Sequence, residues 1–211
     1  MPRKEARSYR LQEGYAGVNV NGSSSYVING EYLYEKHRFT HYKTVEGINI
    51  TGYSDTRPIF SKEARIVYYK IGVKNAGNKV VRKVLTSKYF RDKLYFYVYA
   101  IMKEPFKPLQ RITTDIDLML YEPGFSSAKD LGRKGKLYFI ENSPYPTKNS
   151  LIVLSMPFNF EVHVYKSSAY TPGEFPEDAE LITDSVAKGN KVEIKMSMEP
   201  KMGYFFKVCP L

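Results

Sequence analysis

The sequence is poor in the residues that form covalent cross-links and metal clusters. Cys209 is the only cysteine, so no disulfide can form within the chain, and a zinc site built from several cysteines is excluded. We therefore expect Cys209 to serve as a small hydrophobic residue near the C-terminus. No apolar run approaches the ~18 residues of a membrane-spanning helix. No hydrophobic segment follows the basic N-terminus, so we expect no secretory signal either.

Signatures of hydrolytic catalysis are also missing. A serine hydrolase needs a nucleophile, a base and an acid within reach of one another, but the chain has no Gly-x-Ser-x-Gly segment and no subtilisin-type Gly-Thr-Ser segment. His37 and His41 have a spacing that suits a metal only on a helix, and no helical pattern surrounds them. His163 falls on the polar side of an alternating segment, where a surface histidine is expected. We predict that the chain is not an enzyme.

Aromatic residues are abundant instead, with 19 Tyr and 12 Phe but no Trp among 211 residues. Aromatic and β-branched residues favour strands, and here they form short segments separated by Gly, Pro and Asn turns. Helical periodicity is weak, and 79–90 is the best candidate for a short helix. Strands without interleaved helices predict an all-β fold, an antiparallel β-sandwich or jelly roll. The predicted strands are 65–73, 94–102, 116–121, 137–140, 151–154, 158–165, 191–198 and 204–209.

The chain divides into two parts by composition. Residues 1–58 are rich in Gly, Asn and Ser and show no sustained hydrophobic period, so we predict an irregular N-terminal segment or arm. Within this part, Asn29-Gly30 predicts a tight turn. Residues 59–211 contain the predicted strands and form the predicted β-sandwich domain.

The net charge of +10 comes from the first half of the chain, where residues 1–105 hold 19 Lys and Arg against 9 Asp and Glu. A basic patch attracts nucleic-acid backbones, anionic lipids or acidic proteins. Tyr89 and Phe90 lie among the basic residues, and single-strand binders combine both kinds of side chain. A nucleic-acid-binding protein is therefore one interpretation, and a solubilising surface is the other. The predicted basic patch comprises Lys79, Arg82, Lys83, Lys88, Arg91 and Lys93.

Asp115 and Asp117 are the strongest candidates for chemistry. On a strand they share one face, about 6.5–7 Å apart, and the apolar residues of the segment face the other way. Two like charges on one face need solvent, a basic partner or a cation. Oxygen ligands suit Ca²⁺, so we predict a calcium site here, to which Asp130 and Glu141 add ligands. In the alternative, both aspartates pair with Arg111 or a neighbouring lysine.

The Asp-x-Asp-Leu strand ends in Pro-Gly at residue 124 and stands in a recognisable order of segments. A strand that ends at Pro105 precedes it, and Asn142, an apolar strand and the alternating strand 160–165 follow it. In this order, residues 59–168 resemble the non-catalytic β-sandwich that follows the protease domain in many subtilisin-like proteases, the pre-peptidase C-terminal or P-domain-like jelly roll. The resemblance implies an accessory, stabilising or binding role, calcium binding by an aspartate of this strand, an extracellular or cell-surface location and a protease chain as partner.

A Tyr-rich sandwich without catalytic groups also suits a structural subunit of a virion or of a cell-surface appendage. In such an assembly the N-terminal arm pairs with the sheet edge of a neighbouring copy. The sequence thus predicts an accessory module first, a self-assembling structural subunit second and a nucleic-acid-binding protein third.

Overall fold

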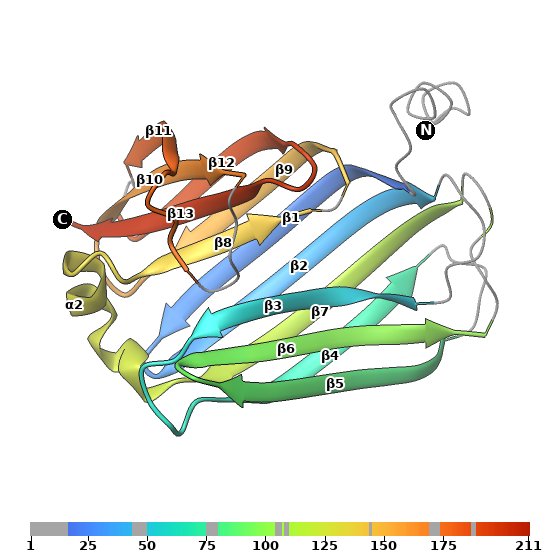
Figure 1. The fold of residues 1–211 in the computed structure, drawn as a ribbon, viewed down its shortest axis with the longest axis horizontal. Coiled ribbons are helices and arrows are strands. Elements are labelled where there is room, and N and C mark those ends of the chain that lie inside the picture. The colour runs from blue at the N-terminus through green and yellow to red at the C-terminus, as the bar shows by residue number, and fades with distance from the viewer. Residues whose placement is uncertain are drawn as a thin grey trace.

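The structure is a computed structural model that describes residues 17–43, 50–74, 80–103, 107, 110–143, 145–168, 174–186 and 189–211. Within these ranges the chain forms thirteen strands, a 3-10 helix η1 (Pro123–Ser127) and a short helix α2 (Ala128–Arg133). The predicted all-β fold is confirmed (Figure 1). In the same ranges, neither helical element is long and apolar enough to cross a membrane.

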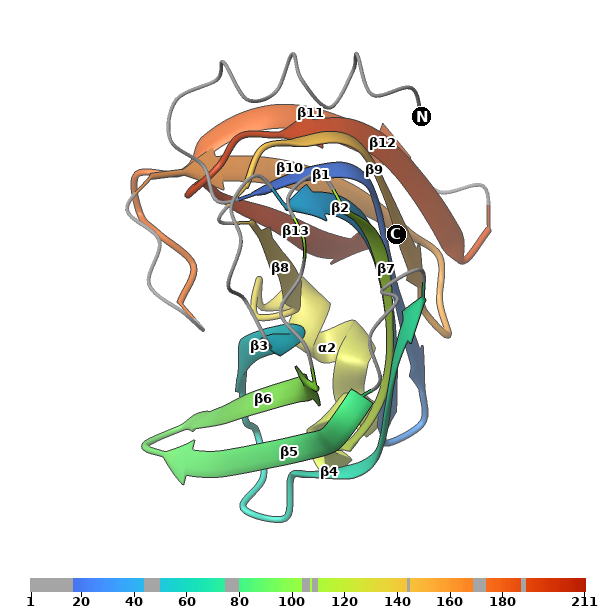
Figure 2. The same cartoon turned by 90° about the vertical axis from the view of Figure 1, so that its right-hand side faces the viewer.

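The larger layer is a six-stranded sheet with the strand order β12-β9-β1-β2-β7-β4. Its pairs are antiparallel except for β1 and β9, which run parallel. Figure 2 shows that this sheet is strongly curved. Its strands are β12 (Lys191–Met198), β9 (Thr147–Ser155), β1 (Gly17–Asn29), β2 (Tyr32–Lys43), β7 (Arg111–Tyr121) and β4 (Arg65–Lys74).

Two smaller antiparallel sheets lie side by side on the concave side of the larger sheet (Figures 1 and 2). One has the order β11-β10-β13-β8 and the other has the order β3-β6-β5, so β8 and β3 are edge strands. The molecule is therefore a sandwich in which one layer is divided in two. The strands of this layer are β11 (Glu180–Val186), β10 (Phe160–Ser167), β13 (Gly203–Pro210), β8 (Tyr138–Asn142), β3 (Ile50–Pro58), β6 (Lys93–Met102) and β5 (Val80–Phe90).

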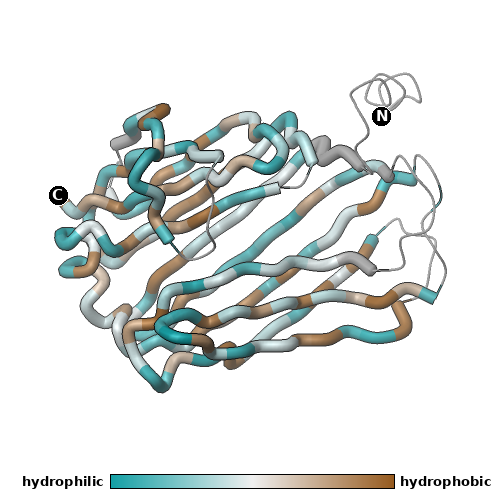
Figure 3. Tube along the Cα trace, in the orientation of Figure 1, coloured by the Kyte–Doolittle hydropathy of each residue, from teal (hydrophilic) through white to brown (hydrophobic). Residues whose placement is uncertain are grey.

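Alternation along the strands builds one hydrophobic core between the layers. Hydrophobic and hydrophilic residues alternate along many strands in Figure 3. In β7, Ile116, Leu118 and Leu120 are buried on one face, as the sequence predicts. In β6, Phe96 and Val98 are buried in the same core cluster. Each fully buried side chain of this kind contributes about 1.5–3 kcal/mol, so the core holds the three sheets together.

Residues 1–58 are not irregular where the structure describes them, because they contain β1, β2 and β3. The turn at Gly30, with φ of +58°, closes the β1–β2 hairpin and confirms the predicted tight turn. Sequence periodicity missed this hairpin because Ser24, Glu35 and His37 occupy inward-facing positions, so no apolar alternation is visible. β1 and β2 also pair with β9 and β7, which belong to the second predicted part of the chain.

The helix predicted for residues 79–90 is wrong, because Val80–Phe90 is strand β5 and pairs with β6 in antiparallel order. Val81, Val84 and Thr86 are β-branched, which restricts their side-chain rotamers and favours a strand. Most residues of β5 are exposed. Its hydrophobic period is therefore weak, and its pairing with β6 determines its conformation.

Candidate functional site

Asp115 and Asp117 lie on the outer, polar face of the six-stranded sheet. Between them, Ile116 points into the core. Serines of β1, cations of β2 and β4 and apolar residues of β9 surround the two aspartates. These side chains line a shallow groove of about 600 Å³, whose residues include Ser23, Ser25, Lys36, Arg38, Lys70, Lys74, Leu151 and Val153.

Two cations neutralise Asp115. Arg38 Nε lies 2.5 Å from Oδ1 of Asp115, and Lys74 Nζ lies 3.2 Å from Oδ2. Burial raises the pKa of this carboxyl, but the hydrogen bonds and charges of the two cations outweigh burial and hold the pKa below its ordinary value. The alternative with basic partners therefore describes Asp115, although the partners are Arg38 and Lys74 instead of Arg111.

The calcium site at Asp115 and Asp117 stays a prediction. The structure does not bring the two additional predicted ligands to these aspartates. Asp130 lies on α2, where Arg133 is its ion-pair partner at 3.5 Å. Glu141 is buried inside the molecule and accepts a hydrogen bond there.

Strand alternation divides the predicted basic patch between two faces of the three-stranded sheet. Arg82 and Lys88 stand opposite Ile101 and Tyr95 in the register of β5 and β6, and each pair shares the outer face. Lys83 follows Arg82 directly and therefore takes the opposite face. A patch that is continuous in sequence is thus split in space.

The other patch residues lie at the β5–β6 turn or before β5. Arg91 has a φ of +54°, and its guanidinium carbon lies 5.3 Å from the centre of the Phe90 ring. Lys93 Nζ lies 2.5 Å from the carboxylate of Glu174. Lys79 lies outside the described residues.

Aromatic side chains of β6, with Phe90 of β5, line part of the outer face of the three-stranded sheet. Phe90 and Tyr97 are each 52% exposed, which is high for large aromatic side chains. The face carries two shallow hollows that meet at Tyr97, one of about 470 Å³ and one of about 400 Å³. We define the aromatic face as Phe90, Tyr95, Tyr97, Tyr99 and Ile101.

The aromatic face was not predicted from the sequence, because 94–102 was identified only as a strand and its two faces were not distinguished. The distinguishing signal is the hydroxyl group. Tyrosines recur at Tyr95, Tyr97 and Tyr99, whereas the alternate positions, such as Phe96, have no polar atom in the side chain. The alternate residues of β6 form the core, and the three tyrosines face outward together with Ile101.

A buried polar network lies where the three sheets meet. Arg57 on β3 donates from Nε to Glu35 on β2 over 3.0 Å, and its Nη2 forms an ion pair with Asp55 at 2.7 Å. Tyr26 on β1 donates its hydroxyl to Glu141 on β8 over 2.5 Å. These contacts connect the six-stranded sheet to each smaller sheet. The network comprises Ser24, Tyr26, Glu35, His37, Tyr53, Asp55, Arg57 and Glu141.

One guanidinium shared by two buried carboxylates separates their pKa values. Burial raises the pKa of Glu35, but the charge of Arg57 and the hydrogen bonds from His37 and Arg57 outweigh burial and lower the pKa from 4.5 to about 2. For Asp55, burial is the strongest influence and raises the pKa from 3.8 to about 6, against the effect of Arg57. As the pH falls, Asp55 is therefore the first of the pair to take up a proton.

Ser24, His37 and Glu35 form a hydrogen-bonded chain within this network. His37 Nδ1 lies 3.0 Å from the hydroxyl of Ser24, and His37 Nε2 lies 3.2 Å from the carboxylate of Glu35. This order of groups is also that of a hydrolase triad. However, Ser24 and His37 are each only 2% exposed, and a nucleophile must be reached by its substrate. These hydrogen bonds therefore satisfy polar groups in the interior of the sandwich.

Comparison with known proteins gives no family assignment, because no protein-family model and no curated protein matches the sequence. A solved structure from Parabacteroides distasonis is similar over 91% of this chain and 40% of the other chain, with a TM-score of 0.45 and 8% sequence identity. The M1 zinc metallopeptidase from Deinococcus radiodurans is similar over 92% of this chain and 43% of the other chain, with a TM-score of 0.40 and 12% sequence identity. Yeast LTA4 hydrolase in complex with bestatin is similar over 98% of this chain and 33% of the other chain, with a TM-score of 0.38 and 10% sequence identity.

The chain spans less than half the length of these solved structures. At these TM-scores and identities, no function is carried over from them. The resemblance to the accessory sandwich of subtilisin-like proteases stays a prediction, and the function rests on the chain's own surfaces.

Proposed function

We propose that the chain is a non-catalytic β-sandwich binding module that contacts a partner protein through its aromatic face. The observation that carries the proposal is the exposure of Phe90 and Tyr97, 52% each, on adjacent strands of one sheet. Aromatic residues are enriched at the centres of protein interfaces, because they bury a large area with few rotatable bonds. Contact with a partner removes these side chains from water and so provides a driving force for binding.

The cations beside the aromatic face define the chemistry of the partner. Arg82 and Lys88 are exposed and share the outer face with Ile101 and Tyr95. The chain as a whole carries a net charge of +10. Complementary charge accelerates encounter and favours partners of opposite sign. The partner is therefore a protein segment that combines acidic residues with apolar side chains.

The enclosed position of the buried polar network supports binding instead of catalysis. Its acid, base and hydroxyl groups contact one another in the interior, and the aromatic face offers contact area without a paired nucleophile and base among its five residues. An accessory role in a secreted or surface protease system, implied by the sequence resemblance, is the biological setting that we propose for this module. Assembly into a virion or appendage is the competing role, and it predicts oligomers in a measurement of solution mass.

Selection from a random peptide library against the immobilised chain tests the binding surface. We expect enriched peptides to be acidic and apolar. The double variant F90A/Y97A should weaken their binding at least about tenfold, or 1.4 kcal/mol. The matched control Y34A/Y68A removes two tyrosines that are 39% and 49% exposed on the six-stranded sheet, and it should bind as the wild type does. Equal binding by both double variants would contradict the proposal.

A single-stranded nucleic acid is the second candidate, because Lys88, Phe90, Tyr95 and Tyr97 line one hollow. Proteins that bind single strands stack bases on aromatic rings and neutralise phosphates with nearby cations. With a labelled oligonucleotide, this function predicts an affinity that falls steeply between ~50 and ~200 mM salt and that is lost in F90A/Y97A. A flat salt response would leave the partner protein as the better-supported ligand.

A further inference from the structure

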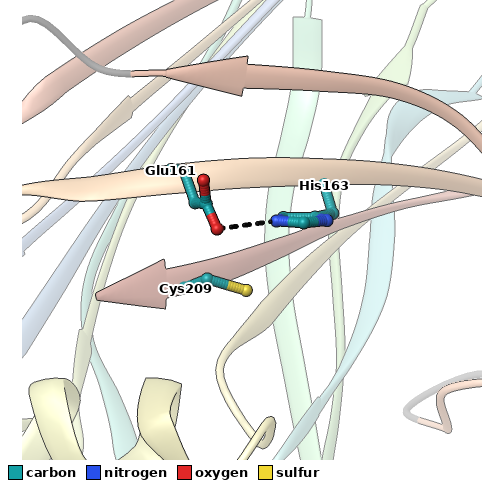
Figure 4. A group of neighbouring side chains, drawn as sticks. All are labelled: Glu161, His163 and Cys209. Carbon is teal, nitrogen blue, oxygen red and sulfur yellow. Dashed lines mark hydrogen bonds and ion pairs between the residues drawn. The ribbon is translucent and has the colours of Figure 1, made fainter. Parts of the chain in front are cut away.

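Glu161, His163, Asp184 and Cys209 gather on the outer face of the four-stranded sheet. Glu161 of β10 stands opposite Cys209 of β13, and His163 follows two positions along β10 on the same face. On the other side of β10, Asp184 of β11 stands opposite His163. Figure 4 shows the Cys209 side chain beside the Glu161–His163 pair.

The donor atoms are close enough to share one metal ion. His163 Nε2 lies 3.0 Å from Glu161 Oε1, and the donor atoms of Glu161, His163 and Cys209 all lie within 4.8 Å of one another. In a tetrahedral zinc site, bonds of about 2.0–2.3 Å place neighbouring ligand atoms roughly 3.3–3.7 Å apart. The three side chains are partly exposed, and zinc binding requires them to rotate until their donor atoms reach this spacing.

Asp184 holds the imidazole of His163 in an orientation that suits a metal ligand. His163 Nδ1 lies 2.9 Å from Asp184 Oδ1, so the neutral imidazole can donate its Nδ1 proton to this carboxylate. The lone pair of Nε2 is then directed toward Glu161 and Cys209. Metal-binding histidines commonly donate their second nitrogen to a carboxylate, which fixes the ring and raises its basicity.

We propose that Glu161, His163 and Cys209 bind one zinc ion, with water as the fourth ligand and Asp184 as a positioning residue. Sulfur, nitrogen and oxygen donors together match zinc, whereas Ca²⁺ and Mg²⁺ take oxygen ligands. The charges also balance, because the carboxylate and the thiolate neutralise Zn²⁺ while the imidazole is neutral. The site is a different place from the predicted calcium site and needs only the single cysteine of the chain.

Zinc binding releases one proton from Cys209. The S–H bond breaks as the S–Zn bond forms, and the proton passes to solvent, so no oxidant or reductant takes part. Burial raises the pKa of this thiol, Lys207 opposes the shift, and Glu161 and Asp184 add to it. A bound zinc ion therefore takes the place of the thiol proton of Cys209.

The ion joins β10 to β13, and Asp184 extends this connection to β11. β13 is an inner strand of the four-stranded sheet, between β10 and β8. A metal bridge on this strand would stabilise the C-terminal end of a chain that cannot form an internal disulfide.

The test uses the full chain without an affinity tag, stripped of metal by a chelator. Calorimetric titration with ZnCl₂ should give one ion per chain, and Co²⁺ should give a thiolate-to-cobalt charge-transfer band. C209S should abolish the band and weaken zinc binding at least about tenfold, and D184N should weaken it by about 10–100-fold. The control E193Q removes a carboxylate that is 50% exposed on β12 and should leave zinc binding unchanged.

Three results would overturn the zinc site. These are a stoichiometry near zero, a cobalt spectrum without the charge-transfer band, and equal zinc affinity in C209S and the wild type. Melting curves provide a second measurement if C209S does not fold. Zinc should then raise the melting temperature of the wild type over the chelated form and leave that of H163Q unchanged, and an equal rise in both would also reject the site.

Discussion

Arg57 and Glu35 form an ion pair that joins β3 to the six-stranded sheet, with Nε 3.0 Å from Oε1 and side chains that are 4% and 2% exposed. Desolvation of two charges costs several kcal/mol each. The attraction between the charges offsets this cost only in one geometry, so the pair specifies how β3 lies on β2. Because the pair is buried, loss of either partner leaves an unpaired charge in the interior and should lower the stability of the protein.

Arg57→Met should lower the free energy of unfolding by about 3–5 kcal/mol, because Glu35 and Asp55 are left buried without a cation. Urea denaturation measures this loss. The matched control is Arg38→Met, which removes the ion pair with Asp115. The side chain of Arg38 is 61% exposed, so this change should lower the free energy of unfolding by less than about 1 kcal/mol. Equal losses of unfolding free energy in the two variants would show that the buried ion pair of Arg57 contributes no more to stability than the exposed one of Arg38.

The carboxyl of Asp55 should make stability depend on pH. Its folded pKa is raised from 3.8 to about 6, so the folded state holds this proton more tightly than the unfolded state. The contribution of Asp55 to stability is greatest below pH 3.8 and decreases as the pH rises through 6.

Asp55→Asn removes this titration. The stability of the variant relative to the wild type should therefore increase by about 1–3 kcal/mol from pH 4 to pH 7. Chemical denaturation of both proteins at several pH values gives the difference directly, and other titrating groups cancel in the comparison. A difference that stays constant across this range would contradict the raised pKa of Asp55.

Tyr26→Phe should destabilise the protein by about 1–3 kcal/mol, because the buried carboxylate of Glu141 loses the hydroxyl that donates to it over 2.5 Å. Thermal and urea unfolding report the loss. Tyr34→Phe is the control, since this tyrosine is 39% exposed. Indistinguishable unfolding of the two variants would mean that Glu141 finds another donor.

The predicted calcium site should respond to removal of its competing cations. In the wild type, Arg38 and Lys74 occupy the carboxylate of Asp115, so the rise in melting temperature with Ca²⁺ over a chelator control should be small. In R38Q/K74Q the carboxylate of Asp115 no longer has its two ion-pair partners, and the rise should be larger. No rise in either protein would reject calcium at Asp115 and Asp117.

The sequence predicted the fold best where each strand buries one apolar face. In β7, Ile116 and Leu118 alternate with aspartates, and this pattern alone identifies both the strand and its buried side. The β1–β2 hairpin could not be identified in this way. Glu35 and His37 can face inward only because Arg57, Ser24 and other distant residues satisfy them, and such contacts depend on tertiary structure.

The candidate sites show the same limit. Glu161 and His163 are visible in the sequence as polar residues two positions apart, but Cys209 joins them only through the register of β10 with β13. The aromatic face similarly needs the pairing of β5 with β6, which sets Phe90 and Lys88 beside the tyrosines of the neighbouring strand. Pairing between strands cannot be read from the periodicity of a single strand.

The parallel pairing of β1 with β9 affects the chain while it is being synthesised. β1 ends at Asn29 and its partner β9 begins at Thr147. The edge of β1 that pairs with β9 therefore stays unpaired until β9 has been synthesised. At ~5–20 residues per second, the wait lasts roughly 6–24 s. An unpaired strand edge invites aggregation.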